Sequence, residues 1–257
     1  MSKIAVTGAA GTIGRRLCAD LARDFQVVRI DLHDAEVIAD VQDIAALERA
    51  FADCETVVHL AGVVAVEASW TDVYGPNIHG TYNAFEAARR KGVKRVIFAS
   101  SNHAVGMHEL ENAPAIYEPG YGLVVPTDAA YRPDSLYGVW KAFGETLGRY
   151  YSDNHGLQVT CVRIGSITDA DDPLDESVRN SSNWLNLTET QKFARYAATW
   201  MSQADFARLV RAILARDVKY AVVYGVGNNA TRFWDLEAGR AIFGFWPLDG
   251  SNSRSRH

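Results

Sequence analysis

The sequence has few of the residues from which disulfide frameworks and structural metal sites are built. It contains three cysteines in 257 residues, Cys18, Cys54 and Cys161, which are far apart and each lie within an apolar run. This spacing predicts buried free thiols in a reducing compartment and matches no metal-binding motif. We therefore expect neither a disulfide nor a bound metal.

Basic clusters and long apolar runs are also missing. The net charge is −5 and no block of lysine and arginine occurs, which argues against nucleic acid and membrane partners and favours a small-molecule substrate. No apolar run could span a bilayer, and the first strand-like run begins at Ile4, which leaves no room for a signal peptide. We therefore expect a cytoplasmic protein.

The first apolar run, residues 4–6, leads into three glycines spaced three apart, and a helical pattern follows. Gly8 permits a tight turn, Gly11 lets the backbone approach a pyrophosphate, and Gly14 lets the helix pack close to the strand. The N-terminus of that helix would present free N–H groups to an anion. A glycine turn alone is a weak signal, but this context predicts a dinucleotide site.

An acidic residue stands where a dinucleotide site needs one. A second strand-like run, residues 26–30, ends on Asp31, about twenty residues beyond the glycines, where a carboxylate would bind the adenosine ribose hydroxyls. Asp31 would repel the additional phosphate of NADP, and the next residues, Leu32 and His33, supply no arginine to bind it. The sequence therefore favours NAD.

Strand-like and helical runs alternate along the chain, which predicts an α/β fold with a doubly wound parallel sheet (Rossmann). We expect an NAD-binding domain over residues 1–165 and a small C-terminal substrate-binding portion over 166–248, which could add a strand and helices to the same domain. Residues 249–257 are polar and rich in serine and arginine, which predicts disorder. Two long stretches, 107–133 and 168–199, show no sustained period and are expected to be loops.

Tyr137 and Lys141 are the candidate catalytic pair. Ser135 is expected to cap a helix in which the two lie one turn apart on one face. Such a pair is usually structural, but the glycine turn and Asp31 favour catalysis: a lysine ammonium and an oxidised nicotinamide would lower the pKa of the phenol from about 10, so that it can accept a proton.

Several motifs together resemble the extended short-chain dehydrogenase/reductases, the NAD-dependent epimerase/dehydratase superfamily. They are Thr7-Gly8-Ala9-Ala10-Gly11-Thr12-Ile13-Gly14, Asp40-Val41, His59-Leu60-Ala61-Gly62, Asn77 ahead of Gly80-Thr81, Ser100-Ser101, Tyr137-Gly138-Val139-Trp140-Lys141 and Arg163-Ile164-Gly165. The resemblance implies that Asp40 and Val41 contact the adenine, that residues 60–62 lie under the pyrophosphate and ribose, and that Asn77 and Lys141 lie near the nicotinamide ribose. The full set expected to bind NAD is Gly8, Gly11, Thr12, Ile13, Gly14, Asp31, Asp40, Val41, Leu60, Ala61, Gly62, Asn77, Ser100, Tyr137, Lys141 and Ile164.

Within that superfamily, the chain looks most like the uronate dehydrogenases and the related enzymes that oxidise glucose 6-phosphate with NAD. The motifs that carry this likeness are Ser100-Ser101-Asn102-His103-Ala104-Val105-Gly106, Arg132-Pro133-Asp134-Ser135-Leu136-Tyr137 and Thr199-Trp200-Met201-Ser202. The resemblance implies that Ser101 holds the reacting oxygen, that Asn102 and His103 face the sugar, and that Arg195 binds the anion of the substrate. Trp140 and Ala65 depart from the pattern of the uronate enzymes.

We therefore predict an enzyme, an NAD-dependent sugar dehydrogenase that oxidises the anomeric carbon of a hexuronate to an aldarolactone, with Ser101, Tyr137 and Lys141 as catalytic residues. Arg179, Lys192 and Arg195 lie in one loop and suit an anionic sugar. The alternatives are a glucose 6-phosphate or neutral aldose dehydrogenase, a nucleotide-sugar epimerase and a non-catalytic NAD-sensing protein. The resemblance also implies a homodimer formed by helices around residues 84–90 and 135–151.

Overall fold

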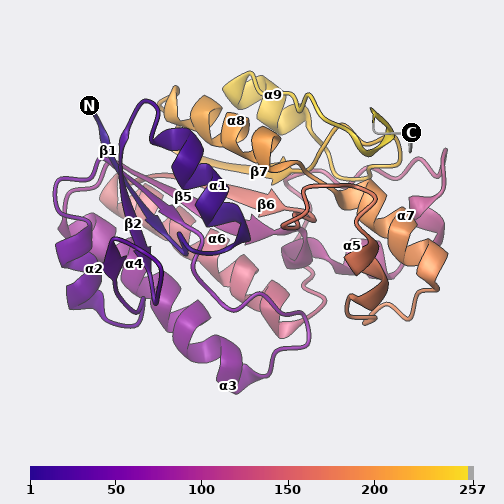
Figure 1. Ribbon diagram of the computed structural model, residues 1–257, viewed down its shortest axis with the longest axis horizontal. Helices are drawn as coiled ribbons and strands as arrows, with labels where there is room; N and C mark the ends of the chain where they lie inside the picture. Colours follow the sequence, from indigo (N-terminus) through magenta and orange to yellow (C-terminus); the bar gives the residue numbers. More distant parts are fainter. Residues whose placement is uncertain (254–257) are drawn as a thin grey trace.

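The architecture is a parallel β-sheet with helices on both faces (Figure 1). The computed structural model describes residues 1–253, and in them the sheet has seven strands in the order β3-β2-β1-β4-β5-β6-β7, each pair parallel. The strands are β1 Lys3–Thr7, β2 Gln26–Asp31, β3 Val37–Ile38, β4 Thr56–His59, β5 Arg95–Ser101, β6 Gln158–Ile164 and β7 Tyr220–Gly225. The strand order reverses between β1 and β4, which confirms the predicted doubly wound sheet.

Two helical layers bury the two faces of the sheet. One layer contains α1 Thr12–Leu21, α8 Gln203–Leu214 and α9 Glu237–Phe243, and the other contains α2 Ile44–Ala50, α4 Gly80–Arg90 and α6 Leu136–His155. Successive residues of β1 face opposite layers: Ile4 and Val6 pack with the first layer, and Ala5 with the second. Burial on both faces explains why the strands are continuous apolar runs.

The helical segment before β5 is interrupted at a glycine and a proline. It consists of α3 Trp70–Val73, a π-helical segment η1 Tyr74–His79, and α4. Gly75 and Pro76 lie in η1, where proline cannot supply an N–H for regular α-helical bonding. The π-helical turn brings Asn77 into the interior, where it is fully buried.

The stretch 107–133 is packed against the C-terminal part of the chain. It contains two short helices, α5 Met107–Leu110 and η3 Ala115–Tyr117. Tyr117 and Val125 join an apolar cluster with Phe233 and Trp234, and Val125 pairs with Trp234 in an isolated β-bridge. These contacts fix the stretch beside the carboxyl ends of the strands.

The stretch 168–199 differs from the expected loop because it contains η4 Glu176–Asn180 and a full helix, α7 Glu189–Thr199. A capping box begins α7: the Thr188 hydroxyl accepts a hydrogen bond from the backbone of Gln191, and the Gln191 side chain accepts one from the backbone of Thr188. This Thr-x-x-Gln pattern is a readable helix start that the sequence analysis missed. α7 lies at the end of the molecule away from the N-terminus (Figure 1).

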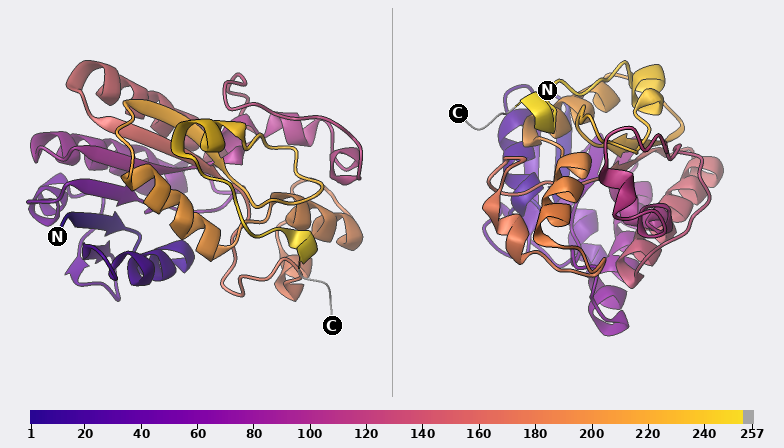
Figure 2. Two further views of the ribbon diagram at one scale, coloured as in Figure 1. Left: turned by 90° about the horizontal axis from the view of Figure 1, so that it is seen from above. Right: turned by 90° about the vertical axis from the view of Figure 1, so that its right-hand side faces the viewer.

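The residues after position 165 complete the main sheet, because β7 pairs with β6 along its whole length. The predicted disorder of 249–257 is wrong for its first residues. Asp249 accepts a hydrogen bond from the Ser202 hydroxyl at 2.6 Å, and its N–H donates to the buried carboxylate of Asp205 at 2.8 Å. A short helix, η5 Ser251–Ser253, follows beside the orange helices in Figure 2. Residues 254–257 lie outside the described part.

All three cysteines are buried and free, as expected. No group of three or more histidine, cysteine and acidic side chains that could hold a metal occurs among the described residues. Across residues 1–253, none of the helices combines the length and the apolar character needed to traverse a bilayer.

Candidate active site

The glycine-rich turn joins β1 to α1 at the centre of the sheet. Gly8 has a φ of 71°, and a Cβ at this position would lie 2.8 Å from the backbone nitrogen of Ala61. A Cβ at Gly14 would lie 2.1 Å from the carbonyl oxygen of Gly8, so only glycine allows α1 to pack this closely. The helix begins after Gly11, which has no side chain to cap the first N–H groups. Those groups and the positive end of the helix dipole suit an anion.

Asp31 ends β2 beside this turn. Its Oδ2 accepts a hydrogen bond from the N–H of Ala10 at 2.8 Å, and its Oδ1 accepts one from the N–H of Leu32 at 2.7 Å. The backbone therefore holds the carboxylate in place on the wall of a cavity that Leu32 and His33 also line. Of the described residues that line this cavity, none is an arginine. This arrangement favours NAD over NADP.

The cavity has a volume of about 660 Å³ and lies along the carboxyl ends of β2, β1, β4, β5 and β6. In open α/β sheets, ligands bind at this edge, beside the point where the strand order reverses. The predicted site residues on its wall are Gly8, Gly11, Thr12, Ile13, Asp31, Asp40, Val41, Leu60, Ala61, Gly62, Ser100, Ser101, Tyr137, Lys141 and Ile164. The volume, the glycine turn and the fixed carboxylate fit a dinucleotide such as NAD.

Two residues expected to bind the cofactor, Gly14 and Asn77, lie behind the cavity wall. Gly14 packs under the turn, as its predicted role requires. The Asn77 side chain accepts a hydrogen bond from the N–H of Val63 at 2.7 Å and donates one to the carbonyl oxygen of Val63 at 3.0 Å. In this structure, Asn77 therefore holds the loop that follows β4, and its contact with the cofactor stays a prediction.

Trp140, which departs from the family pattern, supports the same loop from below. A Cβ at Gly62 would lie 2.3 Å from the Trp140 ring, so the large indole requires glycine there. The indole Nε1 donates to the hydroxyl of Thr81 at 2.8 Å. Trp140 is fully buried, and it acts on the shape of the site through packing. Ala65, the other departure, is exposed in the same loop.

Three chemically active side chains meet where β5 ends and α6 begins. Ser101 is the last residue of β5, and Tyr137 and Lys141 lie in the first two turns of α6. The Ser135 hydroxyl caps this helix by accepting a hydrogen bond from the N–H of Gly138 at 3.1 Å, as the sequence predicts. All three active side chains are buried and line the cavity. The fold therefore brings together the residues predicted to be catalytic.

The electrostatics around Tyr137 differ from the expectation. Burial raises the pKa of Tyr137 to about 12, while a hydrogen bond with Ser101 lowers it and the charge of Asp134 raises it. Lys141 donates its Nζ proton to the carbonyl oxygen of Ala99 and lies 5.3 Å from the centre of the Tyr137 ring. Burial also lowers the pKa of Lys141 well below its usual value. The neighbour that lowers the pKa of Tyr137 in this structure is Ser101, and the joint effect of Lys141 and the oxidised nicotinamide stays a prediction.

His103 faces Tyr137 from the 3₁₀ turn η2, Asn102–Val105. Its Nδ1 lies 2.7 Å from Oδ2 of Asp134, whose buried carboxylate also accepts a hydrogen bond from the Ser135 hydroxyl at 2.8 Å. When Nδ1 donates to Asp134, the neutral ring keeps Nε2 as an acceptor. The His103 and Tyr137 rings meet edge to face with their centres 5.5 Å apart. This position supports the predicted contact of His103 with substrate.

The three basic residues of the stretch 168–199 do not share one site. Arg179 pairs with nearby acidic side chains, and the Nζ of Lys192 donates to backbone carbonyls. Arg195 lies on α7 with its guanidinium 5.5 Å from the centre of the Trp184 ring, and that ring is 5.4 Å from the ring of His103. Of these three cations, Arg195 is therefore the one that Trp184 links to His103. Lys192 lines the same cavity of about 290 Å³ as Arg195, whereas Arg179 does not line it, so the predicted common site is wrong for Arg179 alone.

Sequence reasoning did not assign roles to three residues of this region. Asp134 lies within the motif that leads to Tyr137, so an acid three positions before the tyrosine was a usable signal. Trp184 contacts both His103 and Arg195, and Glu109 forms an ion pair with Arg195 at 2.7 Å. Both lie in stretches without periodicity, so no local signal marked them.

Known proteins resemble the whole chain. The sequence model of the NAD dependent epimerase/dehydratase family matches residues 4–180. The L-arabinose 1-dehydrogenase (NAD(P)(+)) of Haloferax volcanii is 37% identical, over 98% of this chain and 98% of that protein. The NAD-dependent glucose-6-phosphate dehydrogenase of the same organism is 34% identical, over 96% of this chain and 94% of that protein. A crystal structure of uronate dehydrogenase from Agrobacterium tumefaciens, a mutant complexed with NAD, is similar with a TM-score of 0.79 and 32% identity over 98% of this chain and 87% of that chain.

Proposed function

Since the chain belongs to the NAD dependent epimerase/dehydratase family, we propose that it is an NAD-dependent sugar dehydrogenase that oxidises the anomeric carbon of a hexuronate to an aldarolactone. One observation carries this proposal: Ser101, Tyr137 and Lys141 converge on the wall of the cavity that the glycine turn and Asp31 also line. One end of that cavity suits the cofactor and the other end suits the substrate. A dinucleotide fits along the turn, and a sugar fits beside the tyrosine.

The chemistry needs a base, an anchor for oxygen and a hydride acceptor. Bound NAD supplies the last of these by accepting hydride from the anomeric carbon. Tyr137 accepts the proton of the anomeric hydroxyl, and the Ser101 hydroxyl holds the same oxygen and stabilises the phenolate. Because burial raises the pKa of Tyr137 to about 12, this stabilisation is needed near neutral pH. Lys141 orients the nicotinamide ribose, and Asn102 and His103 hold the sugar ring.

The predicted cofactor residues are proposed to bind NAD in two groups. Residues 8–14 and Asp31 bind the pyrophosphate and the adenosine ribose, and Asp40 and Val41 contact the adenine. Leu60, Ala61 and Gly62 lie under the pyrophosphate and ribose, and Ser100 and Ile164 line the nicotinamide end with Tyr137 and Lys141. Apart from Gly14, which packs under the turn, these predicted residues lie together on the cavity wall, which supports this assignment. Asn77 is proposed to lie near the nicotinamide ribose, next to the loop that it holds.

Among the possible substrate classes, we rank a hexuronate first, a sugar phosphate second and a neutral aldose third. Arg195 is proposed to bind the anion of the substrate, because a guanidinium suits a carboxylate or phosphate and Trp184 connects it to His103. Arg195→Ala should raise the KM for the anionic sugar about tenfold or more, since a hydrogen bond to a charged group contributes about 1.5–3 kcal/mol. An unchanged KM would remove Arg195 from the substrate site.

The finer organisation is also proposed. Residues 1–165 form the cofactor part and 166–248 the substrate part of one domain, and the protein works in the cytoplasm as a homodimer. Exposed apolar side chains on α4 and α6, including Tyr82 and Val139, support pairing through these helices. Light scattering at micromolar concentration should give twice the mass of the chain, and a monomer would contradict the dimer.

A substrate panel tests the proposed function. The purified protein is mixed with NAD and with uronates, sugar phosphates and neutral aldoses, and nicotinamide absorbance is followed while the product is identified by NMR. Formation of NADH and a lactone is expected, fastest with a hexuronate. An NAD-sensing protein would bind NAD without turnover, and an epimerase would convert a nucleotide sugar without net reduction of NAD.

A further inference from the structure

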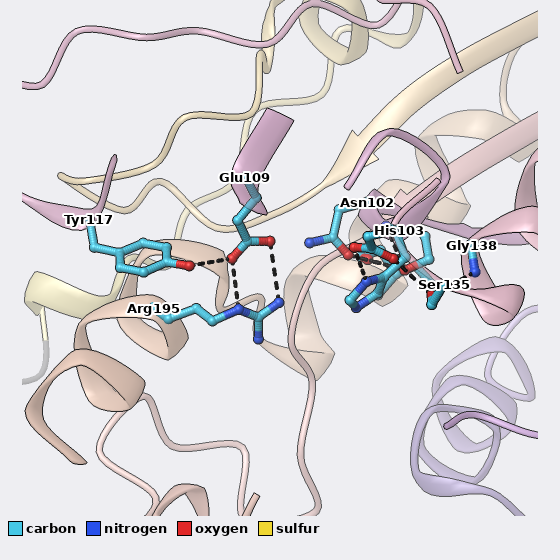
Figure 3. A network of polar contacts seen from close by, with 10 residues as sticks. Asn102, His103, Glu109, Tyr117, Ser135, Gly138 and Arg195 are labelled. Carbon is cyan, nitrogen blue, oxygen red and sulfur yellow. Dashed lines mark hydrogen bonds and ion pairs between the residues drawn. The ribbon is translucent and has the colours of Figure 1, made fainter. Parts of the chain in front are cut away.

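Glu109 forms a buried ion pair with the arginine proposed to bind the anion of the substrate. Arg195 donates from Nε to Oε1 of Glu109 at 2.7 Å and from Nη2 to Oε2 at 3.3 Å (Figure 3). The Tyr117 hydroxyl donates to the same Oε1 at 2.8 Å. The Glu109 side chain is fully buried, and that of Arg195 is 19% exposed. The pair joins α5 to α7, which are far apart in the sequence.

This ion pair lies beside the proposed sugar site. Arg195 lines a second cavity of about 290 Å³, and this cavity shares Gly165 and Ile167 with the cofactor cavity. Trp184 also lines the second cavity, between His103 and Arg195. A sugar whose anomeric carbon lies at Tyr137 can therefore extend towards the guanidinium.

The charge of Arg195 is already balanced. Glu109 occupies Nε and Nη2, which leaves Nη1 outside the ion pair. An anion that approaches Arg195 is attracted by its guanidinium. The same anion is repelled by the carboxylate of Glu109, which is hydrogen-bonded to that guanidinium. Two unit charges about 4 Å apart interact by about 4 kcal/mol at an effective dielectric constant of 20, so such repulsion weakens the binding of an anion. A hydroxyl group meets no such repulsion and can bind to the guanidinium, which lines the cavity.

We propose that Glu109 is a specificity-determining residue that balances the charge of Arg195 and so reduces the preference of the enzyme for anionic over neutral sugars. This inference rests on the proposed function, whose substrate site it refines. It predicts that the enzyme accepts glucose as well as glucuronate, with a limited preference for the anion. Tyr117 orients the carboxylate but leaves its charge unchanged.

The test compares glucuronate with glucose, which differ at the carbon remote from the anomeric centre. The measured quantity is the ratio of kcat/KM for glucuronate to kcat/KM for glucose. Glu109→Gln should raise this ratio at least about tenfold, because Arg195 then keeps an unbalanced charge. The matched control, Tyr117→Phe, removes one hydrogen bond to Glu109 and keeps its charge, so the ratio should stay within about twofold. The KM for NAD should be unchanged in both variants.

The outcomes separate the two proposals. If the unmodified enzyme oxidises neither sugar with NAD, the proposed function fails and this inference fails with it. If it oxidises them and Glu109→Gln leaves the ratio unchanged, only the role of Glu109 is refuted. If Glu109→Gln does not fold, the test uses the unmodified enzyme. An Arg195 whose charge is balanced by Glu109 requires that kcat/KM for glucuronate exceed kcat/KM for glucose by less than roughly a hundredfold. A larger ratio contradicts the proposal.

Discussion

Replacement of Asp31 by alanine should weaken NAD binding and relax the discrimination against NADP. The carboxylate is fixed by the N–H groups of Ala10 and Leu32. Loss of a charged hydrogen bond to the ribose costs about 1.5–3 kcal/mol, which raises the KM for NAD about tenfold to a hundredfold. Unit charges about 4 Å apart repel by about 1 kcal/mol in water and about 4 kcal/mol at an effective dielectric constant of 20. Since Asp31 is partly exposed, the unmodified enzyme should prefer NAD at least about tenfold.

The assay is the ratio of kcat/KM for NAD to kcat/KM for NADP, with one sugar at saturation. The ratio should fall at least about tenfold in Asp31→Ala. Asp34→Asn is a matched control, because it removes a carboxylate three residues later that is 88% exposed and does not line the cavity. It should leave the ratio unchanged. An unmodified enzyme that uses both cofactors equally, or an Asp31→Ala variant with an unchanged ratio, would refute the assignment.

Three other variants test the catalytic residues and the structure that supports them. Tyr137→Phe should keep its affinity for NAD in a calorimetric titration but lose about 10²-fold to 10⁴-fold in turnover. Lys141→Ala should lose both NAD affinity and turnover. Near-normal turnover in Tyr137→Phe would exclude the phenol as the base. Ser101→Ala should shift the rise of the pH–rate profile to higher pH, because the base is active when deprotonated and the lost hydrogen bond had lowered the pKa of Tyr137; a shift to lower pH would reverse our assignment. Glu145→Gln should reduce the free energy of unfolding in urea by about 3–5 kcal/mol, because the fully buried Glu145 pairs with the buried Arg163 at 2.9 Å; unchanged unfolding would show that this pair is not needed.

Local chemistry explains what the sequence could predict. The glycine turn and Asp31 are marked by spacing alone, because a tight strand-to-helix turn accepts few other residues. Tyr137 and Lys141 lie on one helix, so their proximity follows from helical geometry. Since the central strands are buried on both faces, the alternation of apolar runs and helical patterns also predicted a doubly wound parallel sheet.

The rest depends on contacts between distant segments. His103 and Asp134 meet across 31 residues, and Glu109 and Arg195 across 86, so no periodicity could pair them. The high pKa of Tyr137 arises from burial, which the sequence does not give for a single side chain. The helix that carries Arg195 begins at a capping box that can be recognised in the sequence. The polar composition of the helix nevertheless led to the prediction of a loop there.

The central claim is that hydride leaves the anomeric carbon of a sugar for NAD under general base catalysis by Tyr137. The most direct measurement uses glucuronate carrying deuterium at the anomeric carbon, with NMR of the reduced cofactor and of the sugar product. The account predicts that the deuterium appears in the nicotinamide ring, that the sugar becomes a lactone, and that Tyr137→Phe slows the transfer about 10²-fold or more. Deuterium that stays on the sugar while NADH forms would contradict it.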